Sequence, residues 1–185
     1  MDLVEQHSHP NYWFNRASDL RATAGAAWFS MSVNPETVRE ALGLPSGFSM
    51  HVACRPVYHL LCGLALEVLL KGVLALRREQ PPATHDLCVL ADRVAIELSA
   101  NERELLRYYS TTISWAGRYP LPKKPTEDKL RDYWDNAVDV LTTATPLAPG
   151  SFLRVARPSG ADHWDAFHAL YERIETLRWA EERSG

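Results

Sequence analysis

Residues 59–76 constrain the fold more than any other part of the chain. They are hydrophobic on nearly every side and contain no proline, which is typical of a helix that is buried all round. Polar or small residues recur at every fourth position along this stretch: His59, Gly63, Glu67 and Lys71. Because residues four apart share a helical face, they form one slowly drifting stripe. We therefore expect a central buried helix on which Glu67 and Lys71 can pair directly.

Helical patterns also cover most of the remaining chain. Apolar spacing and capping sequences predict helices near residues 13–31, 35–42, 84–98, 99–116, 126–144 and 162–177. Ser99 and Glu102 match a capping box at one of these starts. No alternating strand pattern competes with the helices. The sequence thus predicts an all-α, up-and-down bundle of about five to seven helices, in a single domain over residues 1–185.

Two segments near the end of the chain carry more detailed predictions. In residues 126–144, the positions expected to face inward are Leu130, Trp134, Ala137, Val138 and Leu141. This helix is expected to run on to an exit at Pro146. Residues 145–161 hold three prolines and two glycines, so we expect a loop there, with a short extended piece at residues 152–155.

Charge limits the kinds of ligand that the protein can bind. A chain of 185 residues with 46% hydrophobic content can bury one sizeable core. Its formal net charge of -3 argues against coating nucleic acid by bulk electrostatics. Any contact with a polyanion must therefore be local.

Cysteine usage and the absence of export signals predict the compartment. Cys54, Cys62 and Cys88 lie in apolar surroundings without a CxxC pair, and an odd number leaves no closed disulfide framework. We expect them to be buried thiols in a reducing cytosol. The first residues lack a signal-peptide pattern, and no apolar run is expected to be long enough to span a bilayer. The sequence predicts a cytoplasmic protein without membrane contact.

A basic turn follows the predicted helix end at Gly117. It contains Arg118, Tyr119, Lys123 and Lys124. Arginine offers planar, bidentate recognition of phosphate or carboxylate, and a neighbouring aromatic ring suits a stacked base. We therefore interpret this turn as a phosphate-binding group, with a merely solvated turn as the competing interpretation.

Two histidines lie at predicted helix starts, where the helix dipole favours the neutral imidazole that a general base needs. They are His85 and His163. Both positions also suit helix capping, so a structural role stays open. Glu67 has two interpretations as well. It is either a structural ion pair with Lys71 or a carboxylate that orients a basic group such as Arg118 near a ligand.

Metal and nucleotide motifs are missing from the sequence. No Cys or His pair has the spacing of a zinc site. Neither a Gly-x-Gly-x-x-Gly nor a Gly-x-x-x-x-Gly-Lys-Ser/Thr loop is present. We expect no metal and no cofactor, and any nucleotide would be held by side chains.

Three short motifs lie in the middle of the chain. The apolar helix reads GLALEVLLKG from Gly63, the next helix begins with THDL from Thr84, and WAGRYP follows from Trp115. Together they resemble the HEPN family of helical bundles, in a bacterial branch of that family. The resemblance covers roughly residues 50–125, and the flanking helices agree in kind.

The resemblance implies a helical bundle that usually forms homodimers. Proteins of the family are tied to RNA cleavage, nucleotide handling, toxin–antitoxin pairs and phage defence, and a nucleotidyltransferase-type protein is one expected partner. Its ribonucleases carry an arginine and a histidine separated by four to six residues, commonly with Asn or Asp after the arginine. Copies paired across the dimer form the active site. Fold alone does not decide among these functions.

Two spans of this chain fit the bare spacing of that motif. Arg78 precedes His85 with six residues between them, and Arg157 precedes His163 with five. Neither arginine is followed by Asn or Asp, and about two such matches are expected by chance in a chain this rich in arginine and histidine. The spacing therefore does not identify a catalytic pair.

Two hypotheses follow. In the first, a HEPN-like protein binds or acts on RNA or nucleotide, and any cleavage is metal-independent, with a histidine as general base and an arginine stabilising the phosphorane. His85 with Arg118 is the first candidate pair, and His163 with Arg157 is the second. In the second hypothesis, the chain is a non-catalytic helical dimerisation or adaptor module that binds a partner protein. Convergence of Arg118, His85 and Glu67 in one pocket would favour the first.

Overall fold

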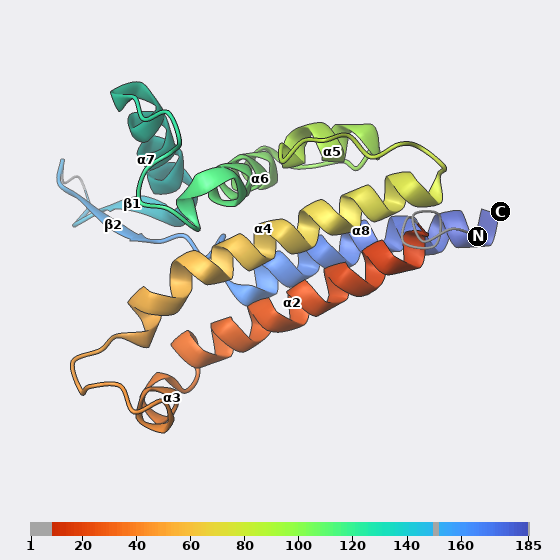
Figure 1. The fold of residues 1–185 in the computed structure, drawn as a ribbon. Helices are drawn as coiled ribbons and strands as arrows, with labels where there is room; N and C mark the ends of the chain where they lie inside the picture. Colours follow the sequence, from red (N-terminus) through yellow and green to blue (C-terminus); the bar gives the residue numbers. More distant parts are fainter. Residues whose placement is uncertain (1–8, 150–151, 185) are drawn as a thin grey trace.

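Three long helices run side by side through the structure, a computed structural model that describes residues 9–149 and 152–184. They are α2 (Pro10–Ser32), α4 (Met50–Leu76) and α8 (Trp164–Ser184) (Figure 1). α4 packs against both of the others. The start of α2 and the end of α8 lie at the same end of this layer.

The remaining elements extend from this layer. They are α3 (Pro35–Ala41), α5 (Leu87–Arg93), α6 (Ala100–Thr111), the π-helical turn η1 (Thr112–Ala116), α7 (Glu127–Leu141), and the strands β1 (Thr142–Pro146) and β2 (Arg154–Pro158). The predicted all-helical class is confirmed, with seven α-helices in the part of the chain that the structure describes.

α4 is the central helix that the sequence predicts. Its side chains from Tyr58 onward are mostly buried. The helix begins at Met50, earlier than expected, because the Ser49 hydroxyl accepts a hydrogen bond from the Val52 N–H and caps the helix. Pro56 then lies inside the helix without ending it, at the loss of one backbone hydrogen bond.

The length of α4 overturns one expectation from the sequence. Its 27 residues, with a mean hydropathy of 1.9 over the most apolar window, reach the length and composition of a membrane-crossing helix. The expectation that no apolar run is long enough is therefore wrong. Of that window, 61% is buried inside the protein, which is the environment of a core helix.

Two glycines let the segment formed by α6 and η1 approach α4 closely. A Cβ on Gly63 would lie 2.9 Å from Ile113 Cγ1, and a Cβ on Gly117 would lie 2.8 Å from Leu60 Cβ. Side chains rarely tolerate such distances, so a larger residue at either position would push the segment away from the core.

Capping residues set the boundaries of α5 and α6. Asp86, rather than Thr84, caps α5 by accepting hydrogen bonds from two backbone N–H groups. The helix ends sooner than predicted, and Ala95 just beyond it adopts a positive φ of 58°. At the start of α6, the predicted capping box between Ser99 and Glu102 is present.

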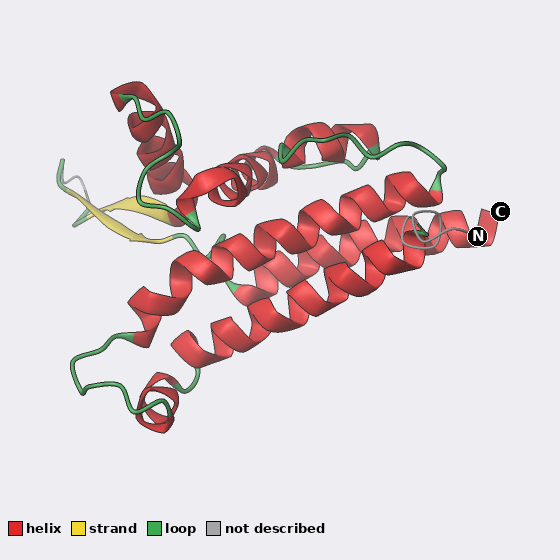
Figure 2. Ribbon diagram, viewed as in Figure 1, coloured by secondary structure: helices red, strands yellow, loops and turns green. Residues whose placement is uncertain are grey.

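The stretch expected to be a helix exit and a loop contains a β-hairpin that projects from the helices (Figure 2). β1 pairs antiparallel with β2, from Thr142 opposite Pro158 to Pro146 opposite Arg154. A helix running to Pro146 is therefore wrong. The short extended piece predicted at residues 152–155 is confirmed only at residues 154 and 155, where β2 begins. Every residue of β2 is exposed, so the strand lacks the alternation by which a sequence reveals a strand.

α7 buries only part of the face that the sequence predicts to lie inward. Ala137 and Val140 are buried, whereas Trp134 and Val138 are 61% and 55% exposed. α7 packs mainly on α6, so only a narrow stripe of it is covered. Tyr133 and Asn136 are partly buried on the same side, and both line the groove described below.

Burial elsewhere follows the predictions in part. On α8, Phe167, Leu170 and Ile174 are buried, at the three- and four-residue spacing of a helix face. Of the three free cysteines, only Cys62 is buried; Cys54 and Cys88 are partly exposed.

Candidate functional site

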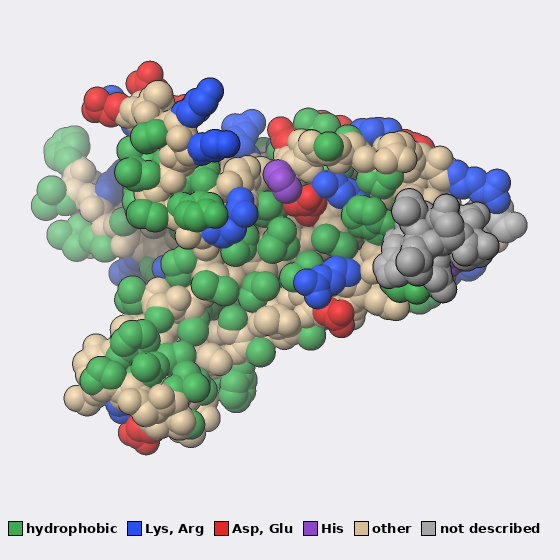
Figure 3. Space-filling view, in the orientation of Figure 1, with side chains coloured by type: hydrophobic (Ala, Val, Ile, Leu, Met, Phe, Trp, Pro, Cys, Tyr) green, Lys and Arg blue, Asp and Glu red, His purple; other side chains and the backbone are tan. Residues whose placement is uncertain are grey.

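An open groove of about 790 Å³ lies between α5, α6 and α7. One wall is a stripe of residues along α6 and η1, spaced three or four apart: Arg103, Arg107, Ser110 and Ser114. The opposite wall is the corresponding stripe of α7: Lys129, Asp132, Tyr133 and Asn136. His85 lines the groove from the loop before α5. Figure 3 shows a histidine gathered with acidic and basic side chains near α5.

His85 is held by a buried carboxylate. Its Nδ1 lies 3.0 Å from Glu67 Oε2 and 3.2 Å from Oε1, and Lys71 Nζ donates to Oε1 at 2.7 Å. Glu67 is buried, whereas the His85 side chain is 59% exposed. A carboxylate only accepts hydrogen bonds, so neutral His85 carries its proton on Nδ1 and leaves the Nε2 lone pair free. Nε2 has no hydrogen-bond partner among the described residues.

Glu67 contacts both Lys71 and His85. Glu67 and Lys71 are in direct contact, as the helical spacing predicts. Glu67 also orients a basic group from another element, and that group is His85, not Arg118. A histidine placed between a buried carboxylate and an open groove is the arrangement of a general base oriented by a third group.

Cations line the groove from both walls. Arg103 donates to Asp92 at 2.9 Å and Arg107 donates to Glu104 at 3.1 Å, and all four side chains are well exposed. Lys129 makes no ion pair within residues 9–149 and 152–184. Exposed ion pairs contribute little stability, so a bound anion can compete for these guanidinium groups.

Two carboxylates, Asp86 and Asp132, also line the groove. Asp86 accepts hydrogen bonds from the N–H groups of Cys88 and Val89, so its charge acts on the start of α5. Anions are therefore attracted only locally, beside the guanidinium and ammonium groups, as the low net charge of the chain predicts.

Aromatic rings form a further part of the lining. Trp115 and Tyr133 lie edge to face with ring centroids 5.1 Å apart. Tyr133 also stacks on buried Tyr108, with centroids 6.0 Å apart and an interplanar angle of 14°. Rings fixed on one side and open on the other provide stacking surfaces for a base.

The serine hydroxyls and the thiol of the groove are already engaged. Ser110 Oγ accepts from the Leu87 N–H, and Ser114 Oγ donates to the Ser110 carbonyl. Burial raises the pKa of the Cys88 thiol, which donates to the Arg103 carbonyl. The groove therefore supplies a base and cations, and an attacking group would come from the ligand.

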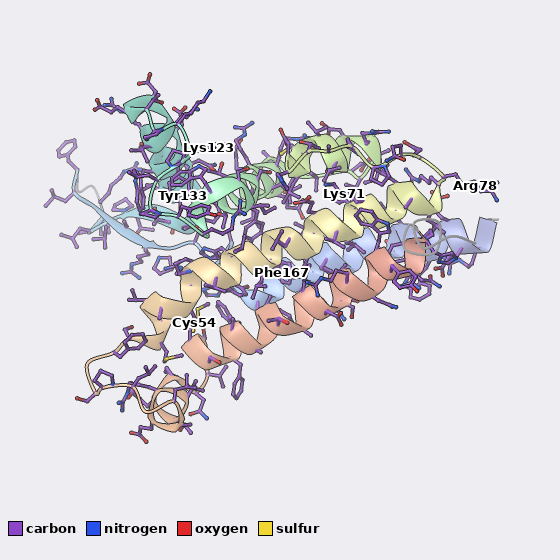
Figure 4. All side chains as sticks on the ribbon, in the orientation of Figure 1. Cys54, Lys71, Arg78, Lys123, Tyr133 and Phe167 are labelled. Atoms are coloured by element: carbon purple, nitrogen blue, oxygen red, sulfur yellow. The ribbon has the colours of Figure 1, made fainter. Side chains whose placement is uncertain are left out.

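Arg118 does not line this groove. Its Nη2 donates to a backbone carbonyl of the preceding turn at 2.8 Å, and its guanidinium lies 5.4 Å from the centre of the Tyr119 ring. Lys123 and Lys124 are exposed in the turn before α7, and Figure 4 shows Lys123 beside that helix. The predicted phosphate-binding turn is thus a neighbour of the groove and not part of its lining.

His163 and Arg157 also lie outside the groove. Arg157 is exposed on β2, opposite Thr143 of β1. His163 precedes α8, and its ring centroid lies 5.2 Å from that of Trp28. This second predicted pair shares no lining with His85.

A second histidine–carboxylate pair is buried in the core. His59 Nε2 lies 3.0 Å from Asp162 Oδ2, and Arg55 Nη2 donates to the same oxygen at 2.8 Å. The Tyr108 hydroxyl lies 2.9 Å from His59 Nδ1. Burial opposes ionisation of Asp162, but hydrogen bonds from His59 and Arg55 outweigh it and hold the pKa of this carboxyl below its usual range.

Sequence reasoning missed most of the groove. Arg103, Arg107, Lys129 and Tyr133 occupy ordinary helical positions, and only the packing of α6 against α7 turns the two stripes toward each other. His59 did stand out in the stripe of α4, but its partner Asp162 is 103 positions away. No local pattern could have joined the two.

A second groove of about 740 Å³ lies between α6, α7, β1 and α8. Glu102 and Arg173 close an ion pair at 2.8 Å within it. Its lining contains no histidine, cysteine or lysine. This second groove is therefore large enough for a ligand but has no side chain in its lining that could act as His85 does.

No protein-family model matches the chain, and neither a curated protein nor a solved structure is significantly similar to it. Among the residues that the structure describes, no group of three or more His, Cys, Asp or Glu side chains is placed to hold a metal ion. Interpretation of the groove therefore rests on its own residues and on the three short motifs.

Proposed function

We propose that the groove between α5, α6 and α7 binds RNA, with His85 as a general base, and that the chain is a HEPN-like, metal-independent endoribonuclease. The observation that carries this proposal is the contact of His85 Nδ1 with Glu67, which leaves Nε2 free at a groove lined by cations and aromatic rings. A base must be fixed and still accessible, and both conditions are met at this position.

In the proposed reaction, His85 Nε2 removes the proton of a ribose 2′-hydroxyl, and that oxygen attacks the adjacent phosphorus. The bond from phosphorus to the 5′-oxygen breaks, and the leaving oxygen takes a proton from water. Arg107 takes the charge-stabilising role first considered for Arg118, because Arg107 lines the groove. Lys129 on the opposite wall holds a neighbouring phosphate.

The family resemblance supports a wider biological proposal. A homodimer that acts in a toxin–antitoxin or phage-defence system, beside a nucleotidyltransferase-type partner, fits proteins that share the three motifs. Light scattering on the purified chain tests the dimer, with an expected mass of twice 20.9 kDa. A mass of one chain would remove the homodimer from the proposal and leave the groove chemistry standing.

RNA cleavage by the purified protein in EDTA tests the proposed activity. Wild type is compared with His85→Ala and Arg107→Ala, and with His163→Ala and Arg118→Ala as the competing candidates. All variants must keep their helical circular dichroism. We expect cleavage to be lost with His85→Ala, weakened with Arg107→Ala, and kept with the other two. Loss with His163→Ala alone would refute the groove as the active site.

One observation favours the adaptor as a second candidate function. Large apolar side chains are exposed around α3 and the adjoining ends of α2 and α4 (Figure 3): Phe29, Val33, Leu42, Phe48, Val52 and Val57. Exposed apolar patches of this kind mark protein-binding surfaces. If the adaptor is correct, Val33→Asp abolishes partner binding while His85→Ala leaves it intact.

A further inference from the structure

The hairpin formed by β1 and β2 is a ribbon that the rest of the chain scarcely covers. It projects beyond the helices (Figure 2), and its residues are exposed except for Thr142, which is partly buried. Leu147 and Phe152, just outside the two strands, are 62% and 101% exposed. A two-stranded hairpin alone is only marginally stable in water. A surface that covers this ribbon would therefore stabilise it.

One face of the hairpin is both apolar and basic. Alternate residues of a strand lie on opposite faces, so Arg157 and Val155 share a face with Thr143, which pairs with Arg157. The same face continues to Leu147, just past β1, whereas Arg154 lies on the opposite face. Neither arginine makes an ion pair with any residue that the structure describes. The hairpin sequence contains no acidic residue, so its positive charge is unbalanced.

The second groove, between α6, α7, β1 and α8, begins at the base of this same face, because Thr143 belongs to its lining. Three carboxylates and one guanidinium line it: Glu102, Glu104, Asp139 and Arg173. Asp139 is exposed and makes no ion pair within residues 9–149 and 152–184. Small side chains in the lining leave room for side chains from outside: Ala161, Ala166 and Ala169. The groove is therefore the acidic counterpart of the basic hairpin face.

We propose that the hairpin of one protomer docks in the second groove of another copy of this chain, where Arg157 pairs with Asp139. The occupant is a second copy because each chain carries both complementary surfaces, side by side on one face. A two-fold rotation then places each hairpin over the groove of the other protomer, so every contact is made twice. This inference rests on the homodimer of the proposed function and names its interface, and it does not require RNA binding.

Reversal of one charge at a time tests this interface. The full chain is diluted in steps, and light scattering gives its mass. Arg157→Glu and Asp139→Arg should each reduce the mass to that of one chain, 20.9 kDa. We expect the dissociation constant of the dimer to rise at least about a hundredfold, because two symmetry-related sites each exchange an attraction for a repulsion.

Mixing the two variants distinguishes a lost interface from a damaged fold. In a mixed dimer, the reversed charges at positions 157 and 139 face each other at one site. The unaltered Arg157 and Asp139 face each other at the second site. An equimolar mixture should therefore regain a mass of twice 20.9 kDa, although each variant alone is a monomer. A variant that merely folds poorly would not be rescued in this way.

Two matched controls come from the same elements. Arg154→Glu reverses a charge on the opposite face of the hairpin. Asp135→Arg reverses a charge one helical turn before Asp139, outside the groove lining. Both variants should stay dimeric, because neither position lies between the docked surfaces.

The outcomes separate this inference from the homodimer on which it rests. Dimers that persist in Arg157→Glu and Asp139→Arg, or monomers that mixing does not restore, overturn the docking of the hairpin and leave the homodimer in place. A wild-type mass of one chain at every concentration overturns the homodimer and the docking together. Neither result affects the groove around His85, which RNA cleavage tests separately.

Discussion

Helix α4 takes part in two histidine–carboxylate contacts that differ in what they leave free. At His59, both ring nitrogens are engaged, by Asp162 and by Tyr108, and the ring is buried. At His85, Glu67 engages Nδ1, Nε2 has no partner within residues 9–149 and 152–184, and more than half of the side chain is exposed. An imidazole and a carboxylate therefore form a buried structural contact at His59 and leave an accessible ring nitrogen at His85.

The difference shows which features decide the role of a histidine. Contact with a carboxylate fixes the tautomer in both cases, so it does not separate them. The two histidines differ in whether the second ring nitrogen has a partner and whether solvent reaches it. Removing the buried pair should therefore affect mainly folding, and removing the exposed pair should affect mainly function.

The largest effect is expected from His85→Ala. RNA cleavage should fall about a thousandfold, within the range for loss of a general base, while the free energy of unfolding changes by less than about 0.5 kcal/mol because the side chain is exposed. Initial rates in EDTA and urea unfolding measure the two quantities. His51→Ala, an exposed histidine at the start of α4, is the matched control and should change neither. A large loss of stability with unchanged cleavage would mean that His85, like His59, has a structural role.

Asp162→Asn should produce the next largest effect, on stability. The substitution leaves Arg55 and His59 without the carboxylate that pairs with both, and breaking a buried pair of this kind costs about 3 kcal/mol. Urea unfolding followed by circular dichroism measures it. Asp165→Asn, three residues along on exposed α8 surface, should cost a small fraction of that amount. Equal effects of the two variants would mean that the buried network does not hold the core together.

Arg107→Ala should have a smaller effect, confined to the groove. Its exposed pair with Glu104 contributes little to folding, so stability should stay the same. RNA affinity should fall about tenfold, and the slope of log affinity against log salt should decrease by about one because one phosphate contact is lost. Arg131→Ala, paired with Glu127 on α7 and outside the groove lining, is the control. An unchanged salt slope in Arg107→Ala would exclude this arginine from phosphate binding.

The smallest effect is expected from mild acidification. The pKa of Asp162 is lower in the folded protein than its unfolded value of about 3.9. A depressed carboxyl pKa adds stability above the unfolded value, and this stability is lost as the pH falls toward the folded value. Wild type should therefore lose stability more steeply than Asp162→Asn between about pH 4 and pH 2. Parallel curves would show that Asp162 is not the titrating group.

Long-range packing marks the limit of what the sequence could predict. The central helix and the capping box at Ser99 follow from local spacing, and they are confirmed. The Glu67–Lys71 pair is confirmed for the same reason, because both residues lie on one helix. The β-hairpin was missed because its strands are exposed and carry no alternation.

The candidate site depends on contacts that local spacing does not record. The sequence points to His85 by its position near a helix start, but its orienting partner Glu67 lies 18 positions earlier, on α4. Tyr133 meets Tyr108 because α7 packs on α6 with Ala137 and Val140 inward; the sequence pattern predicted Ala137 correctly but favoured Trp134 and Val138 over Val140. The packing partner of α7 determines which of its residues are buried, and a periodicity within one helix does not contain that partner.

Mapping of ligand-induced chemical shifts tests the central claim most directly. The ¹⁵N-labelled protein is titrated with a six-nucleotide RNA whose 2′-hydroxyls are replaced by fluorine, so that it cannot be cleaved by attack of a 2′-oxygen. We predict that the largest shifts fall on the His85 ring, the Trp115 indole N–H and the backbone of Arg107 and Tyr133. Shifts confined to Arg118, Lys123 and Lys124, or centred on His163, would contradict the groove between α5, α6 and α7 as the RNA-binding site.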